Sequence, residues 1–364
     1  MSRGLCVALL LALPVGLGEG RAEACTTFLA ARDGEVVVGK NYDWGLGEGL
    51  VVSNKHGVGK QALTMRPGDR PARWVSKHAS VTFNQYGREM PNGGMNWAGL
   101  MVEVMWLDSS VFPPPDDRPV VTELQFVQYL LDTSATVAEA IKRAGEVRVS
   151  LVHGKVHYLV CDRGGACAAL EFIGGKLVVT TGPSMPVKTL TNHTYAQSVA
   201  FLRRHEGFGG REPIPAGRGS LPRFVRASAK ALVARHPVSL DLPASAFAVL
   251  DSTAQGDYTK WRIVYEPARR RVHFRSLASP RVKWIDLGRL KRGCTHPVRI
   301  LDLDADLAGD VTAKLQDYTE AANGRLVRTT LGKAGVKLPP AVIDELVRYP
   351  SRLPCAAGKE EGPP

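Results

Sequence analysis

No internal repeat of fixed period and no serine- or glycine-rich linker divides this sequence of 364 residues. A chain of that length buries a substantial core without extra cross-links, so the absence of a divider favours one large domain over two. Neither a GxGxxG pattern nor a P-loop stands between a strand-like and a helix-like segment. A parallel nucleotide-binding fold is therefore disfavoured.

Acidic residues are in the minority, and the excess of basic residues gives a formal net charge of +12. Tight basic groups include Arg203-Arg204, Arg269-Arg270-Arg271 and Lys291-Arg292. None of them lies within an RNA-binding or helix-turn-helix signature, so we expect no nucleic-acid partner. The charge by itself indicates only electrostatic steering of anionic substrates or attraction to anionic lipid surfaces.

The sequence has no apolar run that spans a bilayer with ease, because the run at residues 5–17 is too short. It follows Arg3 and precedes Ala22-Glu23-Ala24, an A-x-A pattern that is typical of a cleaved secretion signal. We therefore expect a signal peptide at residues 1–24, a mature chain that begins at Cys25, and a periplasmic or secreted location. An uncleaved signal anchor is less favoured, because nothing downstream extends the apolar run.

Cysteine is scarce, with six in the whole sequence, and Cys6 leaves with the expected signal. The remaining cysteines are odd in number, so an exported chain that forms disulfides keeps one of them free. Two pairs are candidates for disulfides: Cys161 with Cys167 across the predicted hairpin turn "DRGGA", and Cys294 with Cys355. This pairing leaves Cys25 free. A metal site at the first pair is disfavoured, because neither a second cysteine pair nor a histidine pair lies near it.

The segment after the expected cleavage site is rich in Thr, Phe and Val. Residues 25–32 and 35–43 are strand-like, and Asp33-Gly34 between them is a strong two-residue hairpin signal. This register places Cys25 opposite Tyr42 and returns the segment "KNYD" to the start of the mature chain. A bulge would change which of residues 40–43 share a face with Cys25.

Strand-like and helix-like segments follow in blocks. Residues 92–107 predict a turn and a buried strand, and two helices come next, announced by the capping boxes Thr122 with Gln125 and Thr136 with Glu139. We further expect strands at 156–161, 167–173 and 176–181, helices at 195–206 and 222–235, and a hairpin over 261–277. Strand blocks separated by helix pairs predict an α+β layered domain, in which helices cover antiparallel sheets.

A cysteine at the first position of a mature chain has a particular chemical advantage. Its thiol is nucleophilic as the thiolate, with an ordinary pKa of about 8.5, and a chain α-amine titrates at about 7.7–8.0. Because both groups belong to one residue, the amine accepts the thiol proton directly or through a water molecule, and no histidine is required. No cysteine and histidine arrangement of the papain type occurs in the sequence.

Four blocks follow one another along the sequence: "CTTFLAARDGEVVVGKNYDW", "FNQYGREMPNGGMNWAGLMVEVMWL", "LTNHTYAQS" and "PRFVRAS". In this order they resemble the choloylglycine hydrolase family, which includes bile salt hydrolases and penicillin V acylases. The resemblance runs over roughly residues 25–290 and leaves residues 290–364 weakly covered. It implies a four-layer αββα fold of the N-terminal nucleophile hydrolase type with antiparallel sheets, as a single hydrolase domain over residues 25–364.

The resemblance also implies roles for four polar residues. Cys25 is similar in position to the family's nucleophile, and Asp43 to the carboxylate that holds its α-amine. Asn192 matches the side-chain amide that helps to form the oxyanion hole. Arg223 matches the active-site arginine, although Arg226 is close enough in the sequence to compete for this assignment.

Three further residues belong to the implied site. Trp106 falls where the backbone N–H completes the oxyanion hole, and Trp44 is an aromatic residue near the site. Lys40 departs from the family, which has arginine one residue further from the cysteine. Lysine keeps the positive charge but lacks the planar fork that holds two partners at once.

The function implied by the resemblance is that of an exported amidase, which hydrolyses a linear non-peptide amide through a Cys25 acyl-enzyme without metal or cofactor. Such families act on small-molecule amides such as bile-acid conjugates, phenoxyacetyl penicillins and N-acyl homoserine lactones. The aromatic residues Trp44, Trp106 and Phe112 suit an apolar acyl group. The sequence specifies neither the acyl and amine parts of the substrate nor the oligomeric state, and a homo-oligomer stays open.

Two alternatives remain at this point. An acyltransferase on the same scaffold would use an amine in place of water as the acceptor. A lipid-anchored, non-catalytic periplasmic binding protein would carry an acylated Cys25. The second alternative is less favoured, because Ala22 and Glu23 do not match the residues that usually precede the cysteine of a lipoprotein signal.

Overall fold

The computed structural model describes residues 25–64, 66, 68–152, 154–233 and 241–356. The expected signal peptide, residues 1–24, and the last two residues of the helix expected over 222–235 lie outside this range. Within it, no helix has both the length and the apolar character needed to cross a membrane.

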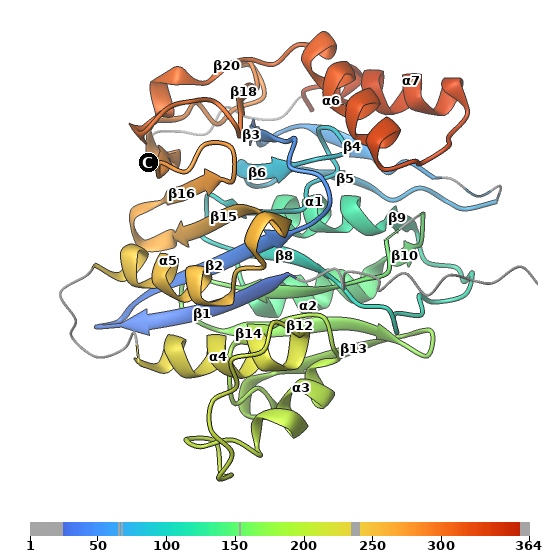
Figure 1. Ribbon diagram of the computed structural model, residues 1–364. Coiled ribbons are helices and arrows are strands. Elements are labelled where there is room, and N and C mark those ends of the chain that lie inside the picture. The colour runs from blue at the N-terminus through green and yellow to red at the C-terminus, as the bar shows by residue number, and fades with distance from the viewer. Residues whose placement is uncertain (1–24, 65, 67, 153, 234–240, 357–364) are drawn as a thin grey trace, which may run out of the picture.

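Two large, mostly antiparallel sheets form the centre of the molecule (Figure 1). The strand order in the first sheet is β14 (Thr189–Leu190), β1 (Thr26–Arg32), β2 (Glu35–Asp43), β15 (Thr259–Glu266), β16 (Arg271–Ser276), β17 (Lys283–Asp286) and β19 (Gly309–Asp310). The order in the second sheet is β13 (Lys176–Thr181), β12 (Cys167–Ile173), β11 (Val156–Cys161), β8 (Met101–Trp106), β7 (Gly93–Asn96), β6 (Ser80–Asn84), β3 (Leu50–Asn54), β18 (Arg299–Asp302) and β20 (Gln316–Asp317).

Smaller strand pairs and seven α-helices complete the described part of the chain. The pairs are β4 (Gly59–Gln61) with β5 (Arg73–Val75), and β9 (Val120–Thr122) with β10 (Arg148–Ser150). The helices are α1 (Glu123–Thr133), α2 (Val137–Glu146), α3 (Tyr195–Leu202), α4 (Ser220–Val233), α5 (Leu242–Thr253), α6 (Glu320–Lys333) and α7 (Pro340–Arg348).

Three apolar cores separate four layers, as the resemblance implied. Successive side chains of a strand point to opposite faces, and in β1 Phe28 packs with α4 and α5 while Leu29 packs between the two sheets. The second sheet packs its other face on α1 and α2, through residues such as Val102 and Leu170. Helices therefore cover the outer face of each sheet, and the inner faces meet in the largest core.

The hairpin β1–β2 has the predicted turn and register. Asp33 and Gly34 have φ angles of 53° and 81°, and positive φ at both central residues is the signature of a type I′ turn. Thr26 pairs with Asn41, so the chain before β1 meets the end of β2. Lys40 faces the inter-sheet core, whereas the Asn41 amide points the other way and donates to the carbonyl of Leu250 in α5 at 2.7 Å.

Other local predictions are confirmed in part. The three strands expected at 156–161, 167–173 and 176–181 are β11, β12 and β13. The expected turn before β8 was wrong in part, because Gly93–Asn96 is itself a strand. The helix expected over 195–206 ends at Leu202.

The first capping box was also wrong. Thr122 precedes α1 but makes no capping hydrogen bond, and Gln125 uses its side-chain oxygen to accept from the N–H of Leu63 at 2.8 Å instead of completing the box. Only one of the two hydrogen bonds of the second capping box forms. The Thr136 hydroxyl accepts from the N–H of Glu139, whose carboxylate accepts from the N–H of Ala135 instead of Thr136.

Both candidate disulfides are present. Cys161 pairs with Cys167 across β11 and β12, and Cys294 pairs with Cys355. Cys25 is free and buried.

Candidate active site

Cys25 lies immediately before β1, on the inter-sheet side of the first sheet, with 5% of its surface exposed. Its Sγ is 3.9 Å from the backbone carbonyl oxygen of Asp43 at the end of β2. Burial raises the pKa of the thiol above its ordinary value, and the positive charges of Lys40 and Arg223 partly oppose that shift. The hairpin thus brings two residues that the sequence predicted for the site into one buried cluster.

Asp43 has one satisfied and one unsatisfied carboxylate oxygen. Thr259 donates its hydroxyl to Oδ1, from a point in β15 where the pairing with β2 shifts register. Oδ2 is buried and has no hydrogen-bond partner among the described residues. Burial raises the pKa of Asp43 to about 6, although the nearby cation of Arg223 lowers it.

Arg223, Asn192 and Trp106 form a chain of hydrogen bonds that reaches Cys25. The Arg223 guanidinium donates to the carbonyl of Cys25 at 2.6 Å and to Oδ1 of Asn192 at 2.9 Å. Asn192 in turn donates from Nδ2 to the carbonyl of Trp106 at 2.9 Å. Arg226 instead donates to the carbonyls of Ser252, Pro215 and Gly217, so the geometry favours Arg223 as the arginine of this cluster.

Lys40 belongs to a buried cluster between the sheets that the sequence did not reveal. Its Nζ lies 3.4 Å from Oε2 of Glu103 in β8 and also donates to the carbonyl of Val104. The Tyr265 hydroxyl donates to Glu103. Burial raises the pKa of Glu103 to about 7, and Lys40 partly opposes that shift. A Cβ atom on Gly93 would lie 2.2 Å from Oε1 of Glu103, so the glycine leaves room for this carboxylate.

A second buried pair positions the segment that carries Asn192. His157 in β11 contacts Glu171 at 3.0 Å through Nδ1 and donates from Nε2 to the carbonyl of Thr191 at 2.7 Å. Glu171 also accepts from the N–H of Tyr195 at the start of α3. Sequence reasoning missed both residues, because their sequence neighbours predict only a meander of strands.

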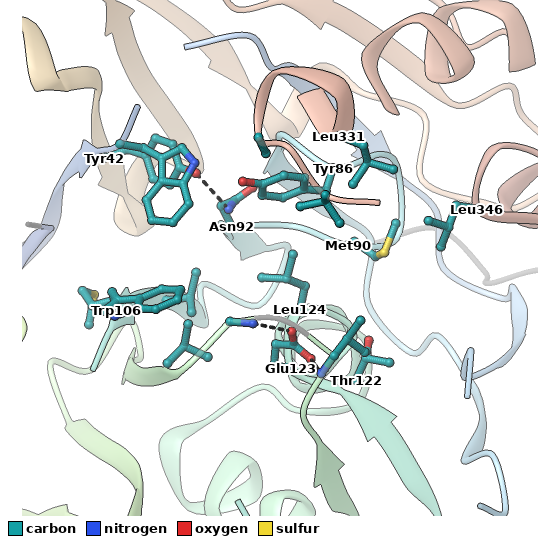
Figure 2. A pocket seen from close by; sticks show the side chains of 18 of the residues that line it. Tyr42, Tyr86, Met90, Asn92, Trp106, Thr122, Glu123, Leu124, Leu331 and Leu346 are labelled. Carbon is teal, nitrogen blue, oxygen red and sulfur yellow. Dashed lines mark hydrogen bonds between the residues drawn. The ribbon is translucent and has the colours of Figure 1, made fainter. Parts of the chain in front are cut away.

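The cluster opens into a cavity of about 490 Å³. Cys25, Asp43, Trp44 and Trp106 line one part of it, and the rings of the two tryptophans lie 5.8 Å apart. Figure 2 shows Tyr42 and Trp106 on one side of this cavity, with Leu331 and Leu346 on the other. Phe112 is not among the lining residues. It packs instead against Phe172, with 4.8 Å between the ring centroids.

The part of the chain that the structure describes contains no group of three or more histidine, cysteine, aspartate or glutamate side chains placed to bind a metal ion. The chemistry available around Cys25 is that of a buried thiol, an incompletely paired carboxylate, two cations and a side-chain amide.

Two packed sheets between helical layers define the class of N-terminal nucleophile hydrolase folds. Within that class, the chain belongs to the linear amide C–N hydrolases of the choloylglycine hydrolase family, because the family model matches residues 25–299. The protein is therefore a hydrolase that acts on linear amide C–N bonds.

Three comparisons illustrate the range of similar proteins. Penicillin V acylase from Pectobacterium atrosepticum is 26% identical over 266 residues, covering 61% of this chain and 70% of that protein. The structure of penicillin V acylase from Agrobacterium tumefaciens superposes with a TM-score of 0.72 at 28% identity, covering 81% of this chain and 98% of the other. A mutant of conjugated bile acid hydrolase from Clostridium perfringens shares the fold, with a TM-score of 0.61 at 14% identity over 81% of this chain and 96% of that one.

Proposed function

We propose that the protein is exported, is cleaved after Ala24, and hydrolyses a linear amide with an apolar acyl group through a Cys25 acyl-enzyme. In the full-length chain the nitrogen of Cys25 is part of a peptide bond. Cleavage converts it into an amine on the same residue as the thiol, and the amine then accepts the thiol proton.

The unpaired oxygen of Asp43 is the observation that carries this proposal. Buried carboxylate oxygens in folded proteins are nearly always hydrogen-bonded, yet Oδ2 of Asp43 has no hydrogen-bond partner within the described part of the chain. Because Sγ of Cys25 already lies 3.9 Å from the backbone carbonyl of Asp43, cleavage before Cys25 would supply an α-amino group close to this carboxylate. The precursor thus carries a site that its own processing completes.

The chemical steps follow from this arrangement. The α-amine takes the thiol proton, the sulfur attacks the amide carbon, and the α-ammonium returns the proton to the departing amine. Nδ2 of Asn192 donates one hydrogen to the Trp106 carbonyl, which leaves the other for the oxyanion, together with the backbone N–H at the Trp106 position. An oxyanion donor of this kind contributes about 3 kcal/mol in the transition state. Water then attacks the thioester and releases the acid.

The lining of the cavity supports an apolar acyl group, because aromatic and aliphatic side chains make up most of it. The two penicillin V acylases among the similar proteins support phenoxyacetyl amides as first candidates. Bile-acid conjugates and N-acyl homoserine lactones complete the set of substrates to be tested.

The test is a panel of these three amide classes incubated with the secreted protein and, in parallel, with Cys25→Ser. We expect release of free amine by the wild-type protein and a loss of roughly 10³-fold or more in kcat/KM in the variant. Edman degradation of the active protein should begin at Cys25, and mass spectrometry should show neither a retained leader nor a lipid. Amide hydrolysis by a protein that starts at any other residue would contradict the proposed role of the α-amine.

A further inference from the structure

The cavity beside Cys25 has a wall that lies outside the part of the chain matched by the family. The family model ends at residue 299, whereas α6, α7 and the segment between them form a helical hairpin over residues 320–348, here called the C-terminal cap. Seven residues of this cap line the cavity: Leu331, Ala334, Gly335, Val336, Lys337, Leu338 and Leu346. Figure 1 shows both helices together at one end of the molecule, in red.

The cap has a small core of its own. Val327 and Leu331 of α6 are buried with Val347 of α7, and Leu338 and Leu346 pack against them. Asn323 joins the two helices, because its amide donates to the carbonyl of Val347 at 3.0 Å. The residues that face the cavity are therefore held by the packing of the cap itself.

The cap is fixed to the body at three places. Near its start, Oδ1 of Asn323 accepts from the N–H of Arg88 at 2.9 Å, and a Cβ atom on Gly87 would lie 2.7 Å from Val327, so only glycine permits this approach. At the end of α6, Lys333 pairs with Glu48, five residues after Asp43.

The third attachment follows the cap along the chain. Residues 354–356 run beside Gly57 and Gly59, with backbone hydrogen bonds of 2.7 and 2.9 Å. Cys355 in this segment forms the disulfide with Cys294. The cap is thus anchored near its start, at the end of α6 and just beyond α7, and the disulfide limits how far it can move from the cavity.

The surfaces that the cap and the body present to each other across the cavity are apolar. Leu63, Met90 and Leu124 face the cavity from the body, and Figure 2 shows Met90 and Leu124 between Trp106 and Leu346. Glu123 is an acidic residue there, and its oxygens accept from the N–H groups of Val152 and Gly154 at 2.9 Å each. The cap contributes one cation, Lys337, which is exposed.

We propose that the C-terminal cap determines acyl specificity, by forming the wall against which the far end of an extended, uncharged acyl group packs. This inference rests on the proposed function, because it assumes that the acyl group enters the cavity from Cys25. The side of the cavity next to Cys25 is built from residues within the family match, and the side opposite Trp106 is built from Leu331 and Leu346 of the cap. Selection for acyl length is thereby assigned to a segment that the family model does not include.

The experiment compares a series of N-acyl amides that share one amine and differ only in acyl length, from acetyl to dodecanoyl. Each buried methylene raises kcat/KM by roughly fourfold, so we expect a steep rise with length in the wild-type protein until the chain meets the cap. Leu346→Ala should lower the ratio of kcat/KM for decanoyl over butanoyl amide by roughly tenfold. The matched control is Ile343→Ala, because Ile343 packs in the same small core but does not line the cavity.

The disulfide provides a second, independent variant. Cys294→Ser with Cys355→Ser should loosen the cap and broaden the length preference, and a reducing agent should have the same effect on the wild-type protein. Equal ratios in wild type, Leu346→Ala and the double serine variant would overturn the role of the cap while leaving the amidase intact.

A binding measurement separates this inference from the amidase proposal. Calorimetric titration with free butanoate, octanoate and dodecanoate should show affinity that rises with length in the wild type and rises less in Leu346→Ala. If no amide is hydrolysed, the proposed function fails, but this titration still decides whether the cap binds apolar chains. Affinity that is independent of length in the wild type would overturn the inference.

Discussion

Asp43 illustrates a conflict between stability and function at a single residue. Among the residues that the structure describes, only one oxygen of its buried carboxylate has a hydrogen-bond partner, and burial raises its pKa to about 6. A carboxyl group whose pKa is higher in the folded than in the unfolded chain stabilises the fold below its ordinary pKa and loses that contribution as the pH rises through the folded value. In the uncleaved precursor, Asp43 therefore destabilises the fold above about pH 6.

We predict that Asp43→Asn stabilises the uncleaved precursor at pH 8 by about 1–3 kcal/mol, because the buried charge is removed. The gain should disappear below about pH 4, where Asp43 is protonated in both states. Urea unfolding of the two precursors as a function of pH measures this difference. In the mature protein the same substitution should abolish amidase activity, because the α-amine loses its partner.

Asp132→Asn is the matched control for that prediction. Asp132 is also a fully buried aspartate, but Lys60 lies 2.9 Å from its carboxylate and Trp74 donates to it at 2.8 Å. Burial raises the pKa of Asp132 as well, but the ammonium of Lys60 opposes that shift. Neutralising Asp132 should destabilise the protein, because it leaves the buried Lys60 ammonium with one counter-charge fewer. A precursor that Asp43→Asn destabilises as much as Asp132→Asn does would show that Oδ2 of Asp43 has a partner in solution.

At the scale of elements, Lys40 and Glu103 connect β2 of one sheet to β8 of the other. We predict that Lys40→Met raises the pKa of the Cys25 thiol further above its ordinary value, because it removes a cation that stabilises the thiolate. Lys40→Arg should retain most of the wild-type behaviour. The measurement is the rate of alkylation of Cys25 by iodoacetamide as a function of pH.

Lys40→Met with Glu103→Gln separates this electrostatic effect from damage to the fold. Because both partners lose their charge, the double variant should recover stability relative to Lys40→Met. It should nevertheless keep the raised thiol pKa. If its alkylation profile returned to that of the wild type, the cation of Lys40 would not be what stabilises the thiolate.

The same elements show which structural features the sequence could predict. The hairpin β1–β2 was predictable because Asp33-Gly34 sets turn type and register locally, and this alone brings Cys25 to Asp43. Glu103 and Tyr265 lie 162 positions apart and meet only because the two sheets stack. No local sequence pattern marks such a pair. A glutamate inside an apolar strand therefore has no visible explanation in the sequence until its partners in the fold are known.

A competing hydrogen-bond partner explains why the first predicted capping box is absent from the structure. Thr122 and Gln125 have the spacing of a capping box, but the Gln125 side chain accepts from Leu63, which lies far away in the sequence. A tertiary contact thus replaced the local one. The family resemblance covered residues 290–364 only weakly, so the cap and its place beside the cavity became visible only in the fold.

For the whole molecule, the site is assembled from segments distributed over most of the chain. Cys25 and Asp43 come from the first hairpin, Asn192 and Arg223 from the α3–α4 region, and the cap closes the cavity from the C-terminal end. The disulfides act at this scale, because each cross-link restricts the unfolded chain according to the length of the loop that it closes.

The loops closed by the two disulfides differ tenfold in length, with sequence separations of 6 for Cys161–Cys167 and 61 for Cys294–Cys355. From loop-closure entropy, replacing both cysteines by serine should cost about 2 kcal/mol at the first bridge and about 4 kcal/mol at the second. Guanidinium unfolding measures both costs. Its m-value distinguishes their origin, because a longer released loop lets the unfolded chain expose more surface and raises m more. A larger loss of stability on removing Cys161–Cys167, with an unchanged m-value, would instead indicate that this bridge stabilises the folded strands β11 and β12.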